Sequence, residues 1–242
     1  NVTIAPGNVK AVYLDGAGSG AAVTDAFASL SVGAINDITS KAFGTSSIMI
    51  GDNATGTIDA ADNNTGLGVD VFAALTTGDN NTAAGFNSLT SNTTGGANSS
   101  FGTYSLDANT TGSENTAIGK SALGGNTTGA NNTALGRHAL LANTTGANNV
   151  AVGYNALDAN TTASFNTSIG VSSLGATTTG ASNIGIGHQA MFTNTTGAQN
   201  VGIGHGSLYN NTTASNNTAV GYFSLVANTT GSENTAVGRL SL

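Results

Sequence analysis

The stretch Asn115–Gly129, with the sequence N-T-A-I-G-K-S-A-L-G-G-N-T-T-G, decides the fold. Near-copies of it follow one another at a fixed spacing of 17 residues. A period of this kind is typical of a solenoid, in which each coil corresponds to one period of sequence. The glycine that ends N-T-A-I-G recurs over eleven such steps, at Gly51, Gly68, Gly85, Gly102, Gly119, Gly136, Gly153, Gly170, Gly187, Gly204, Gly221 and Gly238.

Alternation within the first part of the repeat predicts a β-strand. In Thr116–Ile118, Val150–Val152 and Ile184–Ile186 the outer two residues are Thr, Val or Ile, and the middle residue is Ala or Gly. Period-two alternation indicates a strand. We expect the branched residues to point into the coil and the small middle residues to point out.

A leucine slot follows each of these strands, and we assign it to a second short strand that also faces inward. Glycine, asparagine and threonine fill the turns between the strands, where they permit positive φ or bond the local backbone. The slot is regular in the second part of the chain, at Leu89, Leu106, Leu123, Leu140, Leu157, Leu174, Met191, Leu208, Leu225 and Leu242.

The sequence therefore predicts an all-β fold, a parallel β-solenoid (β-roll) with 17-residue coils over residues 47–242. Residues 1–46 do not obey the period. We predict that they form an N-terminal cap or an assembly segment, since the first coil of a solenoid must be covered. Within it, Asn1–Ala5 and Val9–Leu14 are predicted strands, and Ala21–Val32 is either a short helix or strands.

Composition excludes several classes of function. The net charge of −7, with five Lys and Arg residues, argues against binding a nucleic-acid backbone. The chain has no cysteine, which removes disulfides, thiol catalysis and cysteine-ligated zinc. No apolar run approaches the ~20 residues that a membrane helix needs. No set of nucleophile, base and orienting group can be named, so we expect no enzymatic activity and no cofactor.

The repeats resemble those of known surface proteins. Asn148–Leu157, N-N-V-A-V-G-Y-N-A-L, and Asn217–Gly231, N-T-A-V-G-Y-F-S-L-V-A-N-T-T-G, are similar to the head repeats of trimeric autotransporter adhesins and to repeats of bacterial surface and phage tail-fibre-like proteins. The resemblance covers residues 48–242. It implies a left-handed parallel β-roll, commonly with three chains side by side, used as an extracellular adhesive or structural rod.

One column of the predicted rod varies in chemistry from copy to copy. It follows the repeat glycine and carries basic and aromatic residues, which are enriched at interfaces. We predict that it contacts neighbouring subunits or, alternatively, glycans. His188 and His205 would stack on one face, where they could bind a transition metal, although no carboxylate shares their register and we predict no metal site. The column is Lys120, Arg137, Tyr154, His188, His205, Tyr222 and Arg239.

A second column begins each N-T-T turn and matches the N-x-T acceptor sequon for glycosylation. Stacked asparagine amides can instead form a hydrogen-bonded ladder. The two interpretations of this column are both open from sequence: a ladder, or a line of glycans along one edge. Its members are Asn92, Asn109, Asn126, Asn143, Asn160, Asn194, Asn211 and Asn228, and further sequons begin at Asn63, Asn80, Asn98, Asn131, Asn166, Asn210 and Asn216.

Two other features suggest ligands without requiring them. The strand threonines resemble the arrays of ice-binding solenoids, but they interchange with Val150, Ile184 and Val201, which indicates an inward slot and disfavours ice binding. Acidic residues in the weakest part of the repeat could bind calcium. Their spacing matches no calcium-binding loop, so we expect solvated charges; they are Asp52, Asp59, Asp62, Asp70 and Asp79.

The sequence thus predicts a non-enzymatic extracellular protein, a subunit of a surface fibre, filament or adhesin-like rod. The repeat stops at Leu242, inside a coil, which predicts association through the solenoid ends. Residues 1–43 of a neighbouring copy are the candidate cover. We expect a homo-oligomer, either a head-to-tail fibre or a side-by-side trimer. The alternatives are a receptor- or glycan-binding tail-fibre segment and, less favoured, an ice-binding solenoid.

Overall fold

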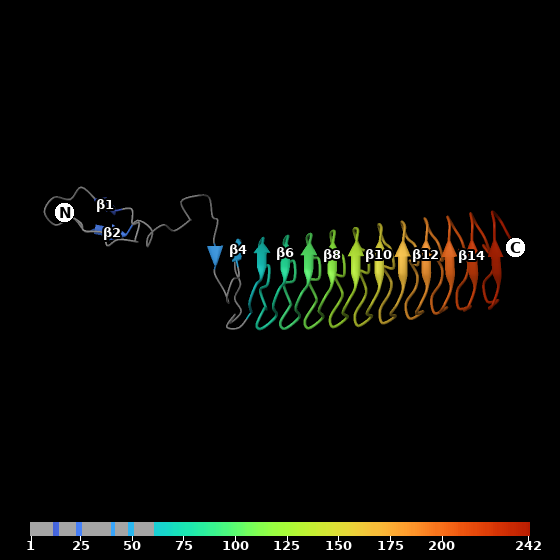
Figure 1. The fold of residues 1–242 in the computed structure, drawn as a ribbon, viewed down its shortest axis with the longest axis horizontal. Helices are drawn as coiled ribbons and strands as arrows, with labels where there is room; N and C mark the ends of the chain where they lie inside the picture. Colours follow the sequence, from blue (N-terminus) through green and yellow to red (C-terminus); the bar gives the residue numbers. More distant parts are fainter. Residues whose placement is uncertain (1–11, 15–22, 26–39, 42–47, 51–60) are drawn as a thin grey trace. The chain divides into compact units, whose positions relative to one another are not determined.

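The computed structural model describes residues 12–14, 23–25, 40–41, 48–50 and 61–242 (Figure 1). The chain divides into two compact units, Asn1–Ser40 and Lys41–Leu242. In the first unit β1 (Val12–Leu14) pairs antiparallel with β2 (Val23–Asp25). Of the strands predicted in this region, Val9–Leu14 is confirmed over Val12–Leu14, and residues 9–11 and Asn1–Ala5 lie outside the described residues. Within Ala21–Val32, Val23–Asp25 is a strand.

The second unit is the predicted parallel β-solenoid. A 13-stranded sheet runs in chain order from β3 to β15, and each strand from β4 onward pairs in parallel with the strand 17 residues later. No helix occurs among the described residues, so none there could cross a membrane. The strands are β3 (Ser40–Lys41), β4 (Ile48–Ile50), β5 (Thr65–Leu67), β6 (Thr82–Ala84), β7 (Ser99–Phe101), β8 (Thr116–Ile118), β9 (Thr133–Leu135), β10 (Val150–Val152), β11 (Thr167–Ile169), β12 (Ile184–Ile186), β13 (Val201–Ile203), β14 (Thr218–Val220) and β15 (Thr235–Val237).

The middle residue of each strand from β5 to β15 points into the coil, so the predicted facing of these strands was wrong. Ala117 is fully buried, whereas Ile118 on the same strand is 40% exposed. The coil is too narrow for larger inward side chains. A Cβ added at Gly185, the middle residue of β12, would lie 2.7 Å from Ser173 Oγ and 3.0 Å from Leu174 Cγ.

From Leu89 to Leu225 the leucine slot is buried as predicted, but it lies in a turn and not in a second strand, and Leu242 in the last coil is exposed. Leu123 has φ of 51°, and every other described leucine or methionine of the slot is also left-handed. That conformation costs about 1–2 kcal/mol for a residue with a side chain. Full burial of a leucine contributes about 1.5–3 kcal/mol, so burial outweighs the strain.

Hydrogen bonds between coils involve the side chains as well as the backbone. The asparagine directly before each strand from β5 to β14 is buried and bonds the equivalent asparagine of the next coil, which for β14 is the half-buried Asn234. For example, Asn115 Oδ1 accepts hydrogen bonds from the backbone N of Asn132 at 3.0 Å and from its Nδ2 at 3.2 Å. We call this column the strand ladder: Asn64, Asn81, Asn98, Asn115, Asn132, Asn149, Asn166, Asn183, Asn200, Asn217 and Asn234.

The asparagines of the N-T-T turns form a second ladder, which we call the turn ladder. Asn126 Nδ2 donates to Asn109 Oδ1 at 2.8 Å and to the carbonyl oxygen of Gly129 at 3.0 Å. The same pair of bonds recurs at Asn143. The ladder interpretation of this column is therefore confirmed. Most coils are therefore closed by two buried amides in addition to their backbone bonds.

The turn ladder has one defect, at Thr177, which replaces asparagine. Asn194 Nδ2 reaches Thr177 Oγ1 only at 3.4 Å. Thr177 has no amide to donate to the preceding coil, and the buried Oδ1 of Asn160 has no hydrogen-bond partner. A buried acceptor left unsatisfied costs about 1–3 kcal/mol.

We predict that Thr177→Asn stabilises the rod. The new amide would donate to Asn160 Oδ1 and accept from Asn194, as its counterparts do elsewhere in the ladder. The gain should be about 1 kcal/mol, visible as a higher midpoint in thermal unfolding followed by circular dichroism. Thr178→Asn, one residue along the same turn, is the control and should bring no gain. A T177N midpoint equal to or below that of the wild type would contradict this account.

We also predict that Gly136→Ala destabilises the rod severely. Gly136 has φ of 137°, and an added Cβ would lie 2.5 Å from the carbonyl oxygen of Gly153 in the next coil. We expect a loss of at least about 2 kcal/mol in the same unfolding measurement. Gly124→Ala is the matched control, because Leu141 occupies the equivalent position one coil later. Similar effects of the two substitutions would disprove the proposed role of Gly136.

Candidate functional site

The first and third residues of the strands form a flat outward surface, which we call the sheet face. It has no charged side chain, and its large apolar residues are substantially exposed, including Leu135 at 44% and Ile169 at 39%. One column of the face is Thr65, Thr82, Ser99, Thr116, Thr133, Val150, Thr167, Ile184, Val201, Thr218 and Thr235. The other is Leu67, Ala84, Phe101, Ile118, Leu135, Val152, Ile169, Ile186, Ile203, Val220 and Val237.

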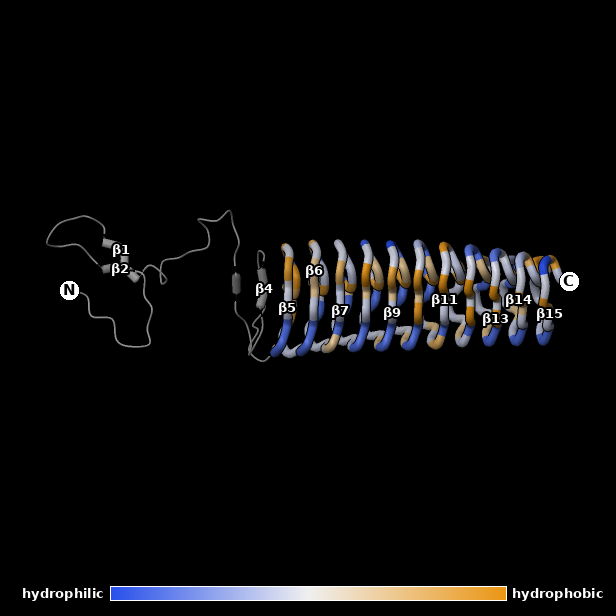
Figure 2. Tube along the Cα trace, turned by 45° about the horizontal axis from the view of Figure 1, so that its top comes forward, coloured by the Kyte–Doolittle hydropathy of each residue, from blue (hydrophilic) through white to orange (hydrophobic). Residues whose placement is uncertain are grey.

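The sheet face extends along the coils without a break. In Figure 2 the hydrophobic segments, in orange, recur from coil to coil along the strands, and hydrophilic segments, in blue, follow one edge of the turns. At about 4.8 Å per strand, the described face from β5 to β15 is roughly 50 Å long. Exposed apolar patches of a few hundred Å² or more mark interaction sites in soluble proteins.

The outward facing of the strand threonines also bears on ice binding. The strand threonines lie on the sheet face and do not fill an inward slot, so the reason given against ice binding was wrong. Three of the eleven positions in the threonine column are nevertheless aliphatic, at Val150, Ile184 and Val201. Hydroxyl groups are absent there, and ice binding stays the less favoured alternative.

The basic and aromatic column lies on the surface, and its rings stack from His188 to Tyr222, whereas Val171 interrupts the column between Tyr154 and His188. His188 and His205 have ring centroids 4.9 Å apart, and His205 and Tyr222 are 5.3 Å apart. The guanidinium groups of Arg137 and Arg239 lie 5.7 Å and 5.6 Å from the ring centroids of Tyr154 and Tyr222. Lys120 is exposed at one end of the column. The residues are thus aligned as expected, and their role in binding stays a prediction.

Stacking determines what this column can offer to a ligand. The ring faces of His205 and Tyr222 cover each other, and Phe223 packs edge-on against both rings, at 4.9 Å and 4.6 Å. The faces that a sugar ring would need are therefore partly occupied. Within the described residues, no group of three or more histidines and acidic residues is arranged to hold a metal ion.

The structure argues against glycans on the turn ladder. Seven of its eight sequon asparagines are fully buried, and Asn228 is half-buried. Their Nδ2 atoms, to which a glycan would be joined, donate the ladder hydrogen bonds. Attachment would break the ladder, so the structure favours the ladder over a line of glycans at these positions. Of the further sequons, Asn98 and Asn166 are buried, whereas Asn63, Asn80, Asn131, Asn210 and Asn216 are exposed.

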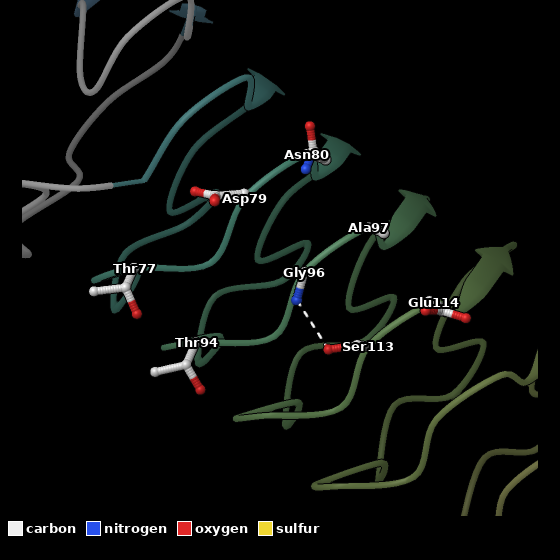
Figure 3. Close-up of a pocket in the computed structure, with 8 residues that line it drawn as sticks. All are labelled: Thr77, Asp79, Asn80, Thr94, Gly96, Ala97, Ser113 and Glu114. Carbon is white, nitrogen blue, oxygen red and sulfur yellow. Dashed lines mark hydrogen bonds between the residues drawn. The ribbon is translucent and has the colours of Figure 1, made fainter.

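A hollow of about 320 Å³ lies beside the strands, and we call it the edge groove (Figure 3). Thr77, from the turn Leu75-Thr76-Thr77, and Thr94, the second threonine of an N-T-T turn, stand on one side of it. Asn80, Ala97 and Glu114 stand on the other, directly before the strand-ladder asparagines. Asp79, Gly96 and Ser113 lie between the two sides, and Ser113 Oγ accepts a hydrogen bond from the backbone N of Gly96 at 3.1 Å.

The edge groove was missed in the sequence because its walls resemble ordinary turn residues. The first threonine of each N-T-T turn bonds the next coil, as Thr110 Oγ1 does to the carbonyl oxygen of Thr127 at 3.0 Å. The second threonine, such as Thr111 or Thr128, is exposed. Only the structure distinguishes the two hydroxyl groups and places the free one beside the groove.

The predicted acidic cluster does not form a calcium site in the described residues. Asp79 Oδ1 accepts a hydrogen bond from the backbone N of Asp62 at 2.7 Å, which joins two coils. Asp52 and Asp59 lie outside the described residues.

Comparisons with known proteins identify no relative. No protein-family model matches the chain, and neither the curated proteins nor the solved structures contain a significant match.

Two half-buried aspartates predict how stability depends on pH. Burial raises the pKa of Asp107 from the ordinary value of 3.8, although backbone hydrogen bonds oppose the shift. Burial likewise raises the pKa of Asp158, opposed by a backbone hydrogen bond and by His138. A raised carboxyl pKa means that the folded state favours the protonated form. The associated stability is present below pH 3.8 and is lost as the pH rises through the folded-state pKa.

We predict that Asp107→Asn raises the thermal midpoint slightly at pH 7, because the desolvated charge is removed while the carbonyl oxygen can still accept the backbone bonds. Thermal unfolding between pH 3 and pH 7 measures this. The advantage over the wild type should shrink as the pH falls, since the wild-type carboxyl becomes protonated. The exposed Glu114→Gln is the control. An advantage that does not change with pH would contradict desolvation as the cause.

Proposed function

We propose that the protein is a non-enzymatic, extracellular structural rod whose copies associate side by side through the sheet face. The observation that supports this is the uncharged, largely apolar face that continues from β5 to β15. A rod with such a surface gains free energy, about 25 cal/mol per Å² of apolar area, when a second surface excludes water from it.

The sizes of neighbouring side chains on the sheet face are complementary, which supports a role in packing. Phe101 is the one aromatic residue of the face within the described strands, and it is 42% exposed. Its partner on the preceding strand is Ala84, and its neighbour in the other column is Ser99. Each of these is the smallest residue of its column, so the ring has room to lie close to the sheet.

A second copy of the chain fits the face better than an unrelated partner of opposite charge, because the face carries no charge to be matched. Its rows repeat at the spacing of the strands. A second copy presents rows with the same spacing, so each contact can be repeated at the next coil. The head-to-tail arrangement suggested by the sequence stays a separate prediction.

The test is the mass of the intact protein in solution, measured by light scattering after size exclusion over a range of concentrations. The wild type should associate. A variant with Leu135→Lys and Ile169→Lys should be monomeric, because burying unpaired charges at the interface costs several kcal/mol and weakens association by about 100-fold or more.

The matched control carries the same added charge on another side of the coil, in Thr128→Lys and Thr145→Lys. It should associate as the wild type does. Both pairs of residues are at the surface, so folding should persist in each variant, which circular dichroism verifies. A monomeric wild type, or equal loss of association in the two variants, would overturn the proposal.

A further inference from the structure

We infer that two copies of the chain pair face to face with their rods parallel, around a twofold axis that runs along the rods between the two sheet faces. This pairing rests on the proposed function, since it gives the same sheet face its partner and its orientation. The charged residues on the two edges of the face support it.

The two edges of the sheet face carry opposite charges. In the described coils, the two residues before each strand-ladder asparagine include no basic residue, and their charged members are Asp62, Asp79, Glu114 and Glu233. On the other edge, the basic and aromatic column includes no acidic residue, although Asp70 lies one position further along its turn. The permanent cations of that column are Lys120, Arg137 and Arg239. A surface that is acidic on one side and basic on the other can complement a rotated copy of itself.

Both glutamates of the chain lie in coils that also carry a cation. Glu114 and Lys120 flank β8, and all of these charged side chains are exposed. Glu233 and Arg239 flank β15 in the same way. Six residues at about 3.3 Å each separate the two charges of a coil, so the strand keeps them apart within one chain. Among the residues that the structure describes, neither glutamate carboxylate has an ion-pair partner.

A twofold axis parallel to the rods brings these charges together. It turns the second copy so that its basic edge faces the acidic edge of the first, and it leaves every coil at its own height. Glu114 then lies opposite Lys120 of the second copy. Glu233 lies opposite Arg239 in the same way, and the symmetry forms each contact twice.

The antiparallel alternative forms neither pair. A twofold axis along the strands would also bring two sheet faces into contact, but it would reverse one rod and place like edges together. Acidic residues would then border acidic residues, and basic residues would border basic ones. Charge therefore favours the parallel pair.

The sizes of the side chains on the sheet face agree with the parallel pair. In that orientation the first residue of each strand faces the third residue of the same strand in the second copy. Phe101, the largest residue of its column, then meets Ser99, the smallest of the other column. The strands from β5 to β15 keep nearly the same direction along the rod (Figure 1), so the two faces can stay in contact over many coils.

The first test is the dimer Kd at low ionic strength, from light scattering after size exclusion, with the mass of two copies expected at saturation. Lys120→Glu with Arg239→Glu should weaken dimerisation about tenfold or more, because like charges would face each other. Glu114→Lys with Glu233→Lys should weaken it similarly, although the first variant lowers and the second raises the net charge of −7. All four substitutions together should restore the wild-type Kd.

Arg137→Glu is the matched control for these variants. It reverses a cation of the same column, but Asn131, at the same height on the other edge, is neutral. Its Kd should therefore stay within about twofold of the wild-type value. An effect of Arg137→Glu as large as that of Lys120→Glu, or no recovery in the fourfold variant, would overturn the parallel pair.

Cross-linking tests the orientation directly, because the chain has no cysteine of its own. Asn148→Cys and Tyr154→Cys are two separate variants on opposite edges of the coil of β10, the middle strand of β5–β15, and both positions are exposed. Packed sheets lie about 10 Å apart, within reach of a short bis-maleimide. We expect covalent dimers only when the two variants are mixed and allowed to exchange.

An antiparallel pair would instead cross-link Asn148→Cys with a second copy of the same variant. That result, or a mass of three copies in light scattering, would overturn the parallel pair and leave the proposed function intact. A monomeric wild type would overturn both.

Discussion

The register of 17 residues between successive coils is the constraint on which the rest of this structure depends. Each strand bonds its neighbours on both sides through the backbone, and two buried asparagines per coil add side-chain bonds in the same direction. A buried amide is costly unless its donor and acceptor groups are satisfied. Here each amide forms a hydrogen bond with the amide of the next coil. The desolvation cost is therefore removed only when successive coils keep the 17-residue register. The narrow interior needs that help, because alanines and one leucine per coil bury little apolar area.

The same narrowness determines the surfaces. Since only small residues fit at the inward strand position, the branched and aromatic side chains lie outside, on the sheet face. A globular protein of this composition would use its isoleucines and valines as core, and this rod displays them. Its polar asparagines, conversely, lie inside. The distribution of residues is therefore inverted relative to an ordinary domain, and the inversion leaves the rod with surfaces suited to contact with other molecules.

Much of the fold could be predicted from the sequence, and the failures have definite physical causes. The glycine period predicted the parallel solenoid, since Gly136 and its counterparts have positive φ and no room for a Cβ. Alternation in Thr116–Ile118 predicted a strand. It did not indicate whether the middle residue or the two outer residues face inward, because that depends on the width of the coil. Nothing in the sequence around Leu123 indicates that its backbone is left-handed. The strand ladder was not predicted because Asn115 and Asn132 resemble ordinary turn residues. The edge groove was not predicted because Thr93 and Thr94 are the same residue type, although only Thr93 bonds the next coil and Thr94 is exposed beside the hollow.

Every junction between described coils from β4 onward pairs strands with the same 17-residue offset. Gene duplication or loss of one whole repeat would therefore leave the strand ladder and the sheet face continuous across the new junction. Such an event would change the length of the rod by about 4.8 Å and little else. Length can thus vary during evolution separately from cross-section, and a lineage could adjust the reach of the rod without redesigning any of its surfaces.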